Sequence, residues 1–370
     1  MTILRKVSMQ SNPPMLFDNQ KLTEEKAIGT CPYCQGKEFI KFGQRFKKLE
    51  TVQVYYCKKC GKKFTPGITK HRTFPLRLIL DGLTYYNRFN TLEGTAQKVS
   101  EKYGIKVSLQ NISNWLDDFK EYLPFLKMRE FIEKKYDKKE ILVESKLFHG
   151  QIYDFKYHRA KTDLILESDF KHYKFRPLQE FLELVVAECP HQIFKDSTKR
   201  ASEYKDIFNL DQVKIVRKDN TAVKNTRFVL QAVANNKLRH ELLQEFMIIN
   251  DSVTVATEVP VLLDKDDILH YQNQLNFQVP ISLEDGEILT GHIDLVQIRN
   301  GMIHLLDYKP SAKKEKPIDQ LIIYALALRR LTSLRLFHFK CAWFDEEDYF
   351  EFFPLHIVYK LKKGKKKQKQ

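Results

Sequence analysis

Three charged side chains that could act together, those of Asp294, Asp307 and Lys309, lie within two apolar segments in the C-terminal third of the sequence. Asp307 and Lys309 are two residues apart, so they share one face of an extended strand. Two carboxylates close together can share one hard divalent cation, which lowers the pKa of a bound water. A neighbouring ammonium could position that water and stabilise the charge of a phosphoryl transition state. These residues therefore predict metal-assisted hydrolysis of a phosphate ester.

The two apolar segments are expected to pair as a β-hairpin. Asn300-Gly301 separates them, and this dipeptide is a strong signal for a type I′ turn. A two-residue turn places Asp294 directly opposite Asp307, and cross-strand partners have Cβ atoms about 4.5–5.5 Å apart. The same register places His292 opposite Lys309. We therefore expect four polar side chains on one face of the hairpin, although a bulge in the turn would remove His292 from that face.

An alternative is that the two aspartates only face solvent. Their neighbours are apolar, however, and burying an unpaired carboxylate is costly unless a cation or a proton compensates. These neighbours are Ile293, Leu295, Leu305 and Leu306. The apolar surroundings favour the interpretation as a metal site.

Four of the six cysteines form two Cys-x-x-Cys pairs that are separated by 22 residues. Each pair can present two thiolates on one tight turn, and two such turns complete a tetrahedral zinc site. Alternating segments at 38–42 and 51–56 read as strands between the pairs. Four ligands leave no open position, so the zinc is expected to be structural. The alternative is four free thiols. The predicted ligands are Cys31, Cys34, Cys57 and Cys60.

The region around these cysteines is strongly basic. From Cys31 to Arg72 it holds eleven Lys or Arg residues and two Glu residues, and aromatic side chains lie among them. This composition suits contact with a phosphate backbone, whereas the alternative is a solvated face of a small domain. The lysines expected to contact DNA are Lys58, Lys59, Lys62 and Lys63.

Residues 73–125 are expected to form three helices. Apolar spacing indicates a first helix around 76–83, and a second helix is expected from near Thr91 to Gly104. Ser108 is a suitable N-cap for a third helix. Two short helices joined by a turn that contains glycine are typical of a helix-turn-helix, and the alternative is an ordinary helical bundle. Side chains of the third helix that could hydrogen-bond to base edges are Gln110, Asn111 and Asn114.

The order of these two N-terminal parts resembles the DNA-binding part of some insertion-sequence transposases. The resemblance covers about residues 29–120, and the third helix carries the sequence Ile-Ser-Asn-Trp-Leu at 112–116. The rest of the chain does not look like the usual transposase catalytic domain.

The C-terminal part, about residues 225–331, resembles the PD-(D/E)XK nuclease superfamily and, within it, the RecB-like branch. The G-x-x-D motif matches Gly291 to Asp294, the D-x-K motif matches Asp307 to Lys309, and the Q-x-x-x-Y motif matches Gln320 to Tyr324. Upstream, Leu238-Arg239-His240-Glu241 looks like the metal-binding His motif of that branch. Glu258 in Thr-Glu-Val-Pro fits a strand that precedes the hairpin.

The resemblance implies roles for individual residues. Mg²⁺ or Mn²⁺ would be bound by His240, Asp294, Asp307 and the Tyr308 carbonyl, and Lys309 would be the catalytic lysine. Gln320 and Tyr324 project from one helical face, so they would cover the site and contact the substrate strand or orient Lys309. Glu258 and His292 are additional candidates. For His240 and Glu258, a purely structural role remains an alternative.

Several nucleases of the RecB-like branch also hold an iron–sulfur cluster through four cysteines that flank the core. Only Cys189 and Cys341 are present around this core, so we expect no iron–sulfur cluster. We expect both cysteines to be small buried hydrophobic residues.

We expect a multidomain α+β protein with a restriction-endonuclease-like C-terminal core. The predicted order is a flexible leader (1–28), the zinc ribbon (29–72), the helix-turn-helix (73–125), a connecting region (126–200), an α/β nuclease domain with a mixed central sheet (201–360) and a basic tail (361–370). The connecting region either supplies the first helices of the nuclease fold or offers a partner surface.

The formal net charge of +15 favours a polyanionic partner, with nucleic acid first. No apolar run is long enough for a transmembrane helix, and the first 20 residues lack the apolar core of a signal peptide. We therefore expect a cytoplasmic, nucleoid-associated protein with DNA as its partner and no membrane contact. A homodimer, or a partner in recombination or repair, remains open.

Together these features predict a metal-dependent DNA nuclease that is docked on DNA by its N-terminal parts. One alternative is a DNA-binding regulator, derived from a transposase, in which the nuclease fold is only a scaffold. The intact set of Asp294, Asp307 and Lys309 argues against that. Another alternative is a component of a recombination machine in which this chain cuts one strand.

Overall fold

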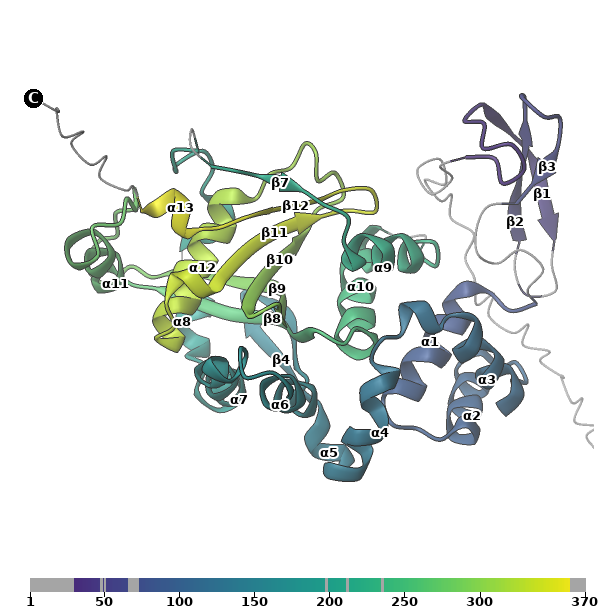
Figure 1. Ribbon diagram of the computed structural model, residues 1–370, viewed down its shortest axis with the longest axis horizontal. Helices are drawn as coiled ribbons and strands as arrows, with labels where there is room; N and C mark the ends of the chain where they lie inside the picture. The colour runs from purple at the N-terminus through teal and green to yellow at the C-terminus, as the bar shows by residue number, and fades with distance from the viewer. Residues whose placement is uncertain are drawn as a thin grey trace, which may run out of the picture.

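The computed structural model describes residues 30–46, 49, 51–65, 73–196, 199–210, 213–233 and 236–359. The predicted leader (1–28) and basic tail (361–370) lie outside the described residues. A small sheet near the N-terminus, a group of helices and a large mixed sheet follow one another along the chain (Figure 1).

The cysteine-bearing region folds as a small antiparallel sheet. Its strands are β1 (Phe39–Phe46), β2 (Thr51–Cys57) and β3 (Lys63–Phe64). β2 pairs with both of the others, and the strands expected at 38–42 and 51–56 coincide with β1 and β2. Tyr55 and Phe64 are buried, and the ring of Phe39 meets both of theirs edge-on at 5.6 Å. This aromatic core is small, so metal ligation would add much of the stability of the unit.

The three helices expected next are present, and the first of them continues beyond the expected 76–83 to Asn87. They are α1 (Leu76–Asn87), α2 (Leu92–Tyr103) and α3 (Leu109–Asp118). Thr91 caps α2 by accepting a hydrogen bond from Gly94 N, and Gly104 ends α2 in the left-handed conformation. Ser108 caps α3 by accepting from Asn111 N. Trp115 is buried against the other helices because it lies on the apolar face of α3.

Residues 126–200 contribute strands as well as the expected helices. The helices are α4 (Leu126–Lys135), α5 (Lys138–Ile141), α6 (Arg159–Ser168), α7 (Arg176–Glu188) and α8 (His191–Asp196). Strands β4 (Val143–His149) and β5 (Gln151–Tyr157) form a hairpin around Gly150, whose φ is 78°. β5 also pairs with a strand from residues 254–263, so this hairpin extends the large sheet.

Among the described residues, nine strands form one mixed sheet in the order β4-β5-β8-β9-β10-β11-β12-β7, with β6 beside β9. The remaining strands are β6 (Lys199–Arg200), β7 (Val216–Arg217), β8 (Thr254–Leu263), β9 (Leu289–Arg299), β10 (Met302–Tyr308), β11 (Phe339–Phe344) and β12 (Tyr349–Phe352). β10 runs parallel to β11 and β6 runs parallel to β9, whereas the other pairs are antiparallel. The prediction of a mixed central sheet is confirmed.

Helices cover both faces of this sheet. The main ones are α9 (Thr221–Leu230), α10 (Asn236–Asn250) and α12 (Ile318–Thr332), and the short helices α11 (Lys265–Leu269) and α13 (Leu355–Val358) lie near the sheet's ends. Leu295, Leu306 and Ala342 are neighbours across three strands and pack with residues of α9 and α10. The adjacent row, Val296, Leu305 and Cys341, points the other way and packs with α7 and α12.

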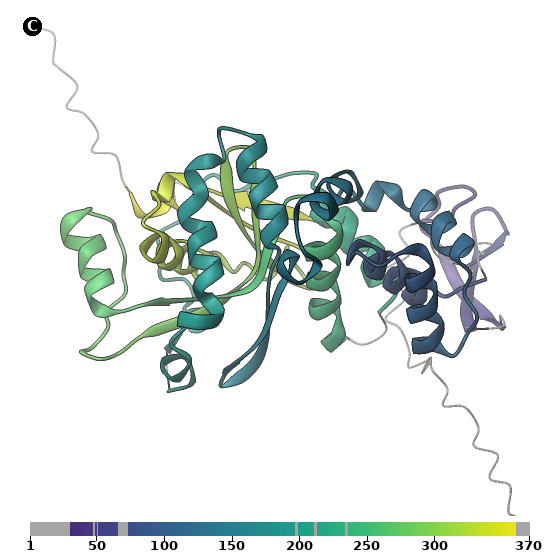
Figure 2. The same cartoon turned by 90° about the horizontal axis from the view of Figure 1, so that it is seen from below.

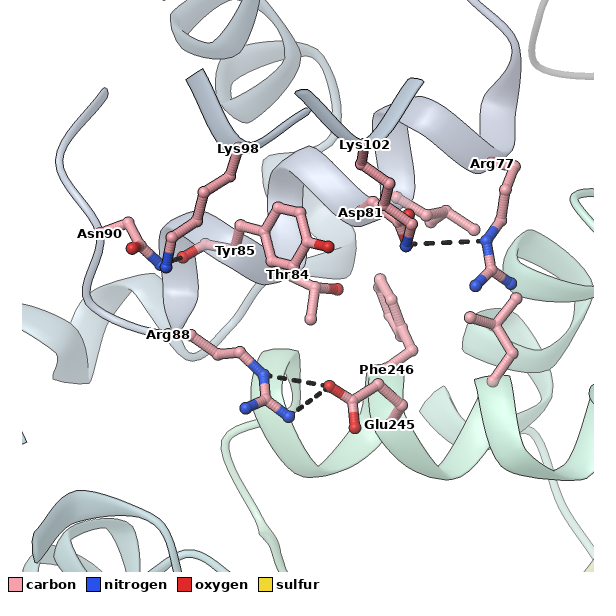
Figure 3. Close-up of a pocket in the computed structure, with 12 residues that line it drawn as sticks. Arg77, Asp81, Thr84, Tyr85, Arg88, Asn90, Lys98, Lys102, Glu245 and Phe246 are labelled. Atoms are coloured by element: carbon pink, nitrogen blue, oxygen red, sulfur yellow. Dashed lines mark hydrogen bonds and ion pairs between the residues drawn. The ribbon is translucent and has the colours of Figure 1, made fainter. Parts of the chain in front are cut away.

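The first three helices are joined to the large sheet through α9 and α10. In both views, α9 and α10 lie between the sheet and these three helices (Figures 1 and 2). Phe228 of α9 stacks on Tyr122 at 4.1 Å and meets Phe119 at 5.2 Å, within one continuous apolar cluster. A cavity of about 460 Å³ lies at the junction of α1, α2 and α10 (Figure 3). Arg88 on its wall pairs with both Glu245 and Glu144, at 2.6 and 2.8 Å.

Candidate active site

The turn between β9 and β10 has the predicted conformation. Asn300 and Gly301 both have positive φ values, 53° and 70°, as a type I′ turn requires, and glycine adopts this conformation without steric cost. The strands pair from Met302 opposite Arg299 to Leu306 opposite Leu295. This is the predicted register, which makes Asp294 and Asp307 the next residues of the two strands.

The backbone ladder ends at this point, and the prediction for His292 is wrong in part. The amide of Tyr308 donates to the side chain of Asp294 (3.0 Å) instead of to a backbone carbonyl of β9, and the amide of Lys309 donates to Phe344 O on β11 (3.0 Å). The two strands therefore separate. The pairing of β9 with β10 ends at Leu295 and Leu306, so His292 and Lys309 are not cross-strand partners, although both line the same cavity.

One side of the site is formed by His240, Glu258 and Asp294, from α10, β8 and β9. His240 Nε2 lies 2.7 Å from Asp294 Oδ2, and its Nδ1 lies 3.8 Å from Glu258 Oε1. One potential ligand atom of each residue lies within 4.8 Å of the other two. Glu258 has a positive φ of 50°, which is strained for a residue with a side chain in a strand. Gln244 holds Glu258 through a hydrogen bond of 2.6 Å.

The other side of the site holds the predicted lysine. The ammonium of Lys309 lies 2.8 Å from Asp307 Oδ2, and Asp307 is only 1% exposed. Gln320 of α12 donates to Asp307 Oδ1 (3.4 Å) and to the Tyr324 hydroxyl (2.8 Å). Gln320 and Tyr324 therefore both line the site, and the hydrogen bond from Gln320 orients Asp307.

Gly291 permits this cover. A Cβ atom at position 291 would lie 2.3 Å from Cε1 of Tyr324, a distance that no side chain could tolerate without displacing the ring. Because Gly291 has no side chain, the ring of Tyr324 can lie directly against β9 at this position. This is a physical reason for the glycine of the G-x-x-D motif.

The charged groups of the site change one another's pKa values. Burial, together with the Asp294 carboxylate, raises the pKa of Asp307 and the pKa of Glu258 to about 7. The Asp294 carboxylate raises the pKa of His240 to about 9. Burial alone would raise the pKa of Asp294, but the contact with His240 outweighs it and holds that pKa below its ordinary value. The crowded carboxylates favour an added positive charge.

The donor set fits a hard divalent cation. Asp294 and Glu258 supply carboxylate oxygens and His240 supplies an imidazole nitrogen, all within 4.8 Å of one another, which is a combination that Mn²⁺ and Mg²⁺ accept. Asp307 lines the same cavity but does not belong to this group of three. Asp307 Oδ2 is buried and, within the described residues, accepts no hydrogen bond of good geometry despite the nearby Lys309 ammonium. Coordination by this oxygen would replace part of its ion pair with Lys309. Whether the Tyr308 carbonyl also binds metal stays a prediction.

These residues line a cavity of about 270 Å³, whose far wall comes from residues that the sequence did not single out. This wall includes His149 and Tyr153 from the β4–β5 hairpin and Arg200 from β6. Apolar–polar alternation on both sides of Gly150 would have indicated the hairpin. No local pattern connects it to β9, because the pairing of β5 with β8 joins residues about 100 positions apart.

Residues 200–348 match the family model of the PD-(D/E)XK nuclease superfamily. This segment is a PD-(D/E)XK nuclease superfamily domain. The matched range contains the whole donor set from His240 to Lys309, together with Arg200 and Tyr324, whereas the β4–β5 hairpin precedes it. The search of curated proteins and the search of solved structures gave no significant match.

Outside the nuclease domain, the four predicted zinc ligands converge. Their sulfur atoms lie within 4.8 Å of one another, with Cys31 and Cys60 at 3.7 Å and Cys34 and Cys57 at 3.6 Å. In a tetrahedral site with Zn–S bonds of about 2.3 Å, the sulfurs are about 3.8 Å apart. The cluster therefore fits a zinc ion closed by four thiolates.

The four lysines predicted to contact DNA are all exposed. Lys62 lies over the ring of Tyr33 at 4.8 Å, and Lys63 lies over that of Phe42 at 3.7 Å. Both rings are about half exposed, at 45% and 50%. Two exposed rings of this unit thus each have a lysine ammonium over one face.

The polar residues predicted to read bases differ in their availability. Gln110 and Asn114 are exposed and hydrogen-bond to each other (2.9 Å), a contact that a base edge could replace. Asn111 is half-buried, and its side chain accepts from the backbone and the hydroxyl of Ser108. Asn111 therefore serves mainly to cap α3, and capping competes with a role in base recognition.

The two remaining cysteines have different environments. Cys341 is buried, and its thiol donates to Leu321 O, as expected for a small core residue. For Cys189 this expectation is wrong, because its half-buried sulfur lies 3.8 Å from Nε2 of His149.

No helix in the described ranges is both long enough and apolar enough to cross a membrane.

Proposed function

We propose that the protein is a Mg²⁺- or Mn²⁺-dependent deoxyribonuclease that hydrolyses phosphodiester bonds. The observation that carries this proposal is the convergence of Asp294, Asp307 and Lys309 with His240 around one cavity inside a PD-(D/E)XK domain. The compact series of G-x-x-D, D-x-K and Q-x-x-x-Y motifs supports placement in the RecB-like branch.

His240, Asp294 and Asp307 would hold the cation, with Glu258 and the Tyr308 carbonyl as further ligands. The bound cation supplies a Lewis acid for the phosphate and lowers the pKa of water. Gln320 fixes the orientation of Asp307 through a direct hydrogen bond. These contacts preorganise the ligands, so little rearrangement is needed when the substrate arrives.

Lys309 would stabilise the charge that develops on the phosphate. Burial alone would lower its pKa, but Asp307 and Asp294 raise that pKa above its ordinary value, so the side chain remains an ammonium. Its partly exposed side chain faces the cavity that Arg200 also lines. Two cations at one cavity suit a phosphodiester, and Arg200 would bind a phosphate of the substrate strand.

The N-terminal parts would dock the nuclease on DNA. The exposed lysines and rings of the zinc ribbon would follow the phosphate backbone, and Gln110 and Asn114 of α3 would face base edges. We propose that the protein is cytoplasmic and associated with the nucleoid, where its DNA substrate is located. The competing proposal, a regulator with an inert nuclease scaffold, predicts DNA binding without cleavage.

The test uses the purified full-length protein with labelled linear, circular and single-stranded DNA, in Mg²⁺, Mn²⁺ or EDTA. The proposal predicts cleavage of at least one substrate with either metal and none with EDTA. Tight binding without cleavage of any substrate would support the inert scaffold. The comparison of linear with circular DNA also separates cutting from ends from internal cutting.

A further inference from the structure

A second group of metal-binding side chains lies at the edge of the nuclease site and is not used by the proposed mechanism. It consists of His149, Cys189 and His191. Nε2 of His149 lies 2.8 Å from Nδ1 of His191 and 3.8 Å from the sulfur of Cys189. One ligand atom of each residue lies within 4.8 Å of the other two.

Three elements bring these side chains together. His149 is the last residue of β4, Cys189 caps the end of α7, and His191 begins α8. Pro190 separates the latter two, and the amide of His191 donates to Cys189 O (2.8 Å), which closes a tight turn. This turn presents a thiol and an imidazole side by side, much as a Cys-x-x-Cys turn presents two thiols.

The spacing is close to that of a zinc site. With Zn–N bonds of about 2.05 Å and Zn–S bonds of about 2.3 Å, tetrahedral ligands lie about 3.3 Å apart for two nitrogens and about 3.6 Å apart for nitrogen and sulfur. The observed separations are 2.8 and 3.8 Å. A change of about half an ångström between the two rings would therefore accommodate the ion, and exposed His191 can supply this movement.

The inner ligand is already oriented. His149 is 1% exposed, and its second nitrogen, Nδ1, lies 2.7 Å from Nε2 of His292. The ring of His292 stacks on Tyr153 at 3.5 Å with an angle of 7° between the planes. A second-shell partner of this kind fixes the tautomer and direction of a ligating imidazole. This gives His292 a role that the hairpin register did not predict.

The ligand types select the metal. One thiolate and two imidazoles favour Zn²⁺ and similar transition-metal ions, whereas Mg²⁺ prefers the oxygen ligands of the neighbouring carboxylate site. A chain of hydrogen-bonded neutral histidines is the alternative. It would account for the two short nitrogen–nitrogen contacts. It would not explain why the Cys189 sulfur lies 3.8 Å from Nε2 of His149.

We propose that His149, Cys189 and His191 bind a zinc ion whose fourth ligand is water. The ion would join the end of α7 and the start of α8 to β4, and so hold the wall of the cavity that carries His149 and Phe194. Binding releases the thiol proton of Cys189 to solvent, because a coordinating thiol is deprotonated. The proposal does not depend on the nuclease activity.

The test is the zinc content of the full-length protein, measured by elemental analysis after saturation with zinc and exhaustive dialysis against excess Mg²⁺, which competes with zinc at the carboxylate site. We expect two zinc ions per chain in the unmodified protein, one in Cys189→Ala and one in His191→Ala. The control is His356→Ala, which changes an exposed histidine on α13 and should retain two. Circular dichroism shows whether each variant is folded. His191 is exposed, so its replacement should leave the fold intact.

A second measurement assigns the lost ion. In Cys31→Ser/Cys34→Ser protein, which lacks the ribbon site, added Co²⁺ should give a thiolate-to-metal absorption band that Cys189→Ala removes. One zinc ion per unmodified chain, or two retained in folded His191→Ala, would overturn the proposal. Both results are read from metal content alone, so they are distinguishable from a failure of DNA cleavage.

Discussion

The side chain of Asp294 accepts a hydrogen bond from the backbone amide of Tyr308, at 3.0 Å. This contact replaces the next rung of the β9–β10 ladder, so the strands separate where the carboxylates begin. His240 approaches the same oxygen of Asp294 at 2.7 Å. The Asp294 carboxylate thus ends the β9–β10 pairing and holds His240 through a direct contact. Its negative charge also raises the pKa of Asp307.

Replacing Asp307 should stabilise the protein when no divalent metal is present. Asp307→Asn removes a buried charge that Asp294 repels, so the free energy of unfolding in EDTA should rise by about 2 kcal/mol. Millimolar Mn²⁺ should raise the melting temperature of the unmodified protein and leave that of the variant nearly unchanged. The control is Asp285→Asn, a change of a carboxylate whose side chain is 94% exposed. Equal metal responses in all three proteins would contradict the assigned ligands.

Adding one methyl group at Gly291 should displace Tyr324. Gly291→Ala places a Cβ 2.3 Å from the ring, which should cost about 1–3 kcal/mol of stability and lower the rate of cleavage about 100-fold. A double-mutant cycle with Tyr324→Ala tests the cause, because the alanine at 291 should cost little once the ring is absent. Additive effects of the two changes would show that the clash is not the reason.

Lys161 should make stability depend on pH. It is fully buried, its ammonium donates to Ile248 O (2.6 Å) and Thr254 O (2.9 Å), and burial lowers its pKa to about 7. The unfolded chain then binds more protons between pH 7 and about 10, so the free energy of unfolding should rise with pH over that window. The difference in that energy between the unmodified protein and Lys161→Met should change by about 3 kcal/mol. A difference that is constant from pH 7 to 9.5 would refute this.

If the proposed docking role is right, the lysines beside the four-cysteine cluster should contribute to DNA affinity and not to chemistry. Replacing Lys58, Lys59, Lys62 and Lys63 by Ala should reduce the slope of log affinity against log salt concentration by roughly 3 to 4. The apparent KM for DNA should rise, and the cleavage rate at saturating DNA should stay unchanged. A lower saturated rate with an unchanged salt slope would place these lysines outside the docking surface.

Much of the local structure could be predicted because its signals are short. Asn300-Gly301 sets the hairpin register, and the caps at Thr91 and Ser108 set the starts of two helices. Each of these depends on a few adjacent residues. The starts of the helices and the register therefore agree with the structure to within a residue or two, whereas the first helix ends four residues later than expected, at Asn87.

The far wall of the site could not be predicted, because long-range pairing creates it. His149 contacts His292 across 143 positions of sequence, through a hairpin that joins the sheet at β8. The side-chain contact between Asp294 and Tyr308 that splits the strands also has no sequence pattern, and for that reason the partner of His292 was predicted incorrectly.

The central claim is that Asp294, Asp307 and Lys309 form the site that cleaves DNA. Single-turnover cleavage of a labelled duplex in Mn²⁺ tests this claim most directly. The unmodified protein and Asp285→Asn should cleave at similar rates, and Asp307→Asn and Lys309→Met should be slower by about 100-fold or more. All four proteins should bind the duplex in EDTA with similar affinity. Cleavage by folded Asp307→Asn at the rate of the unmodified protein would contradict the account.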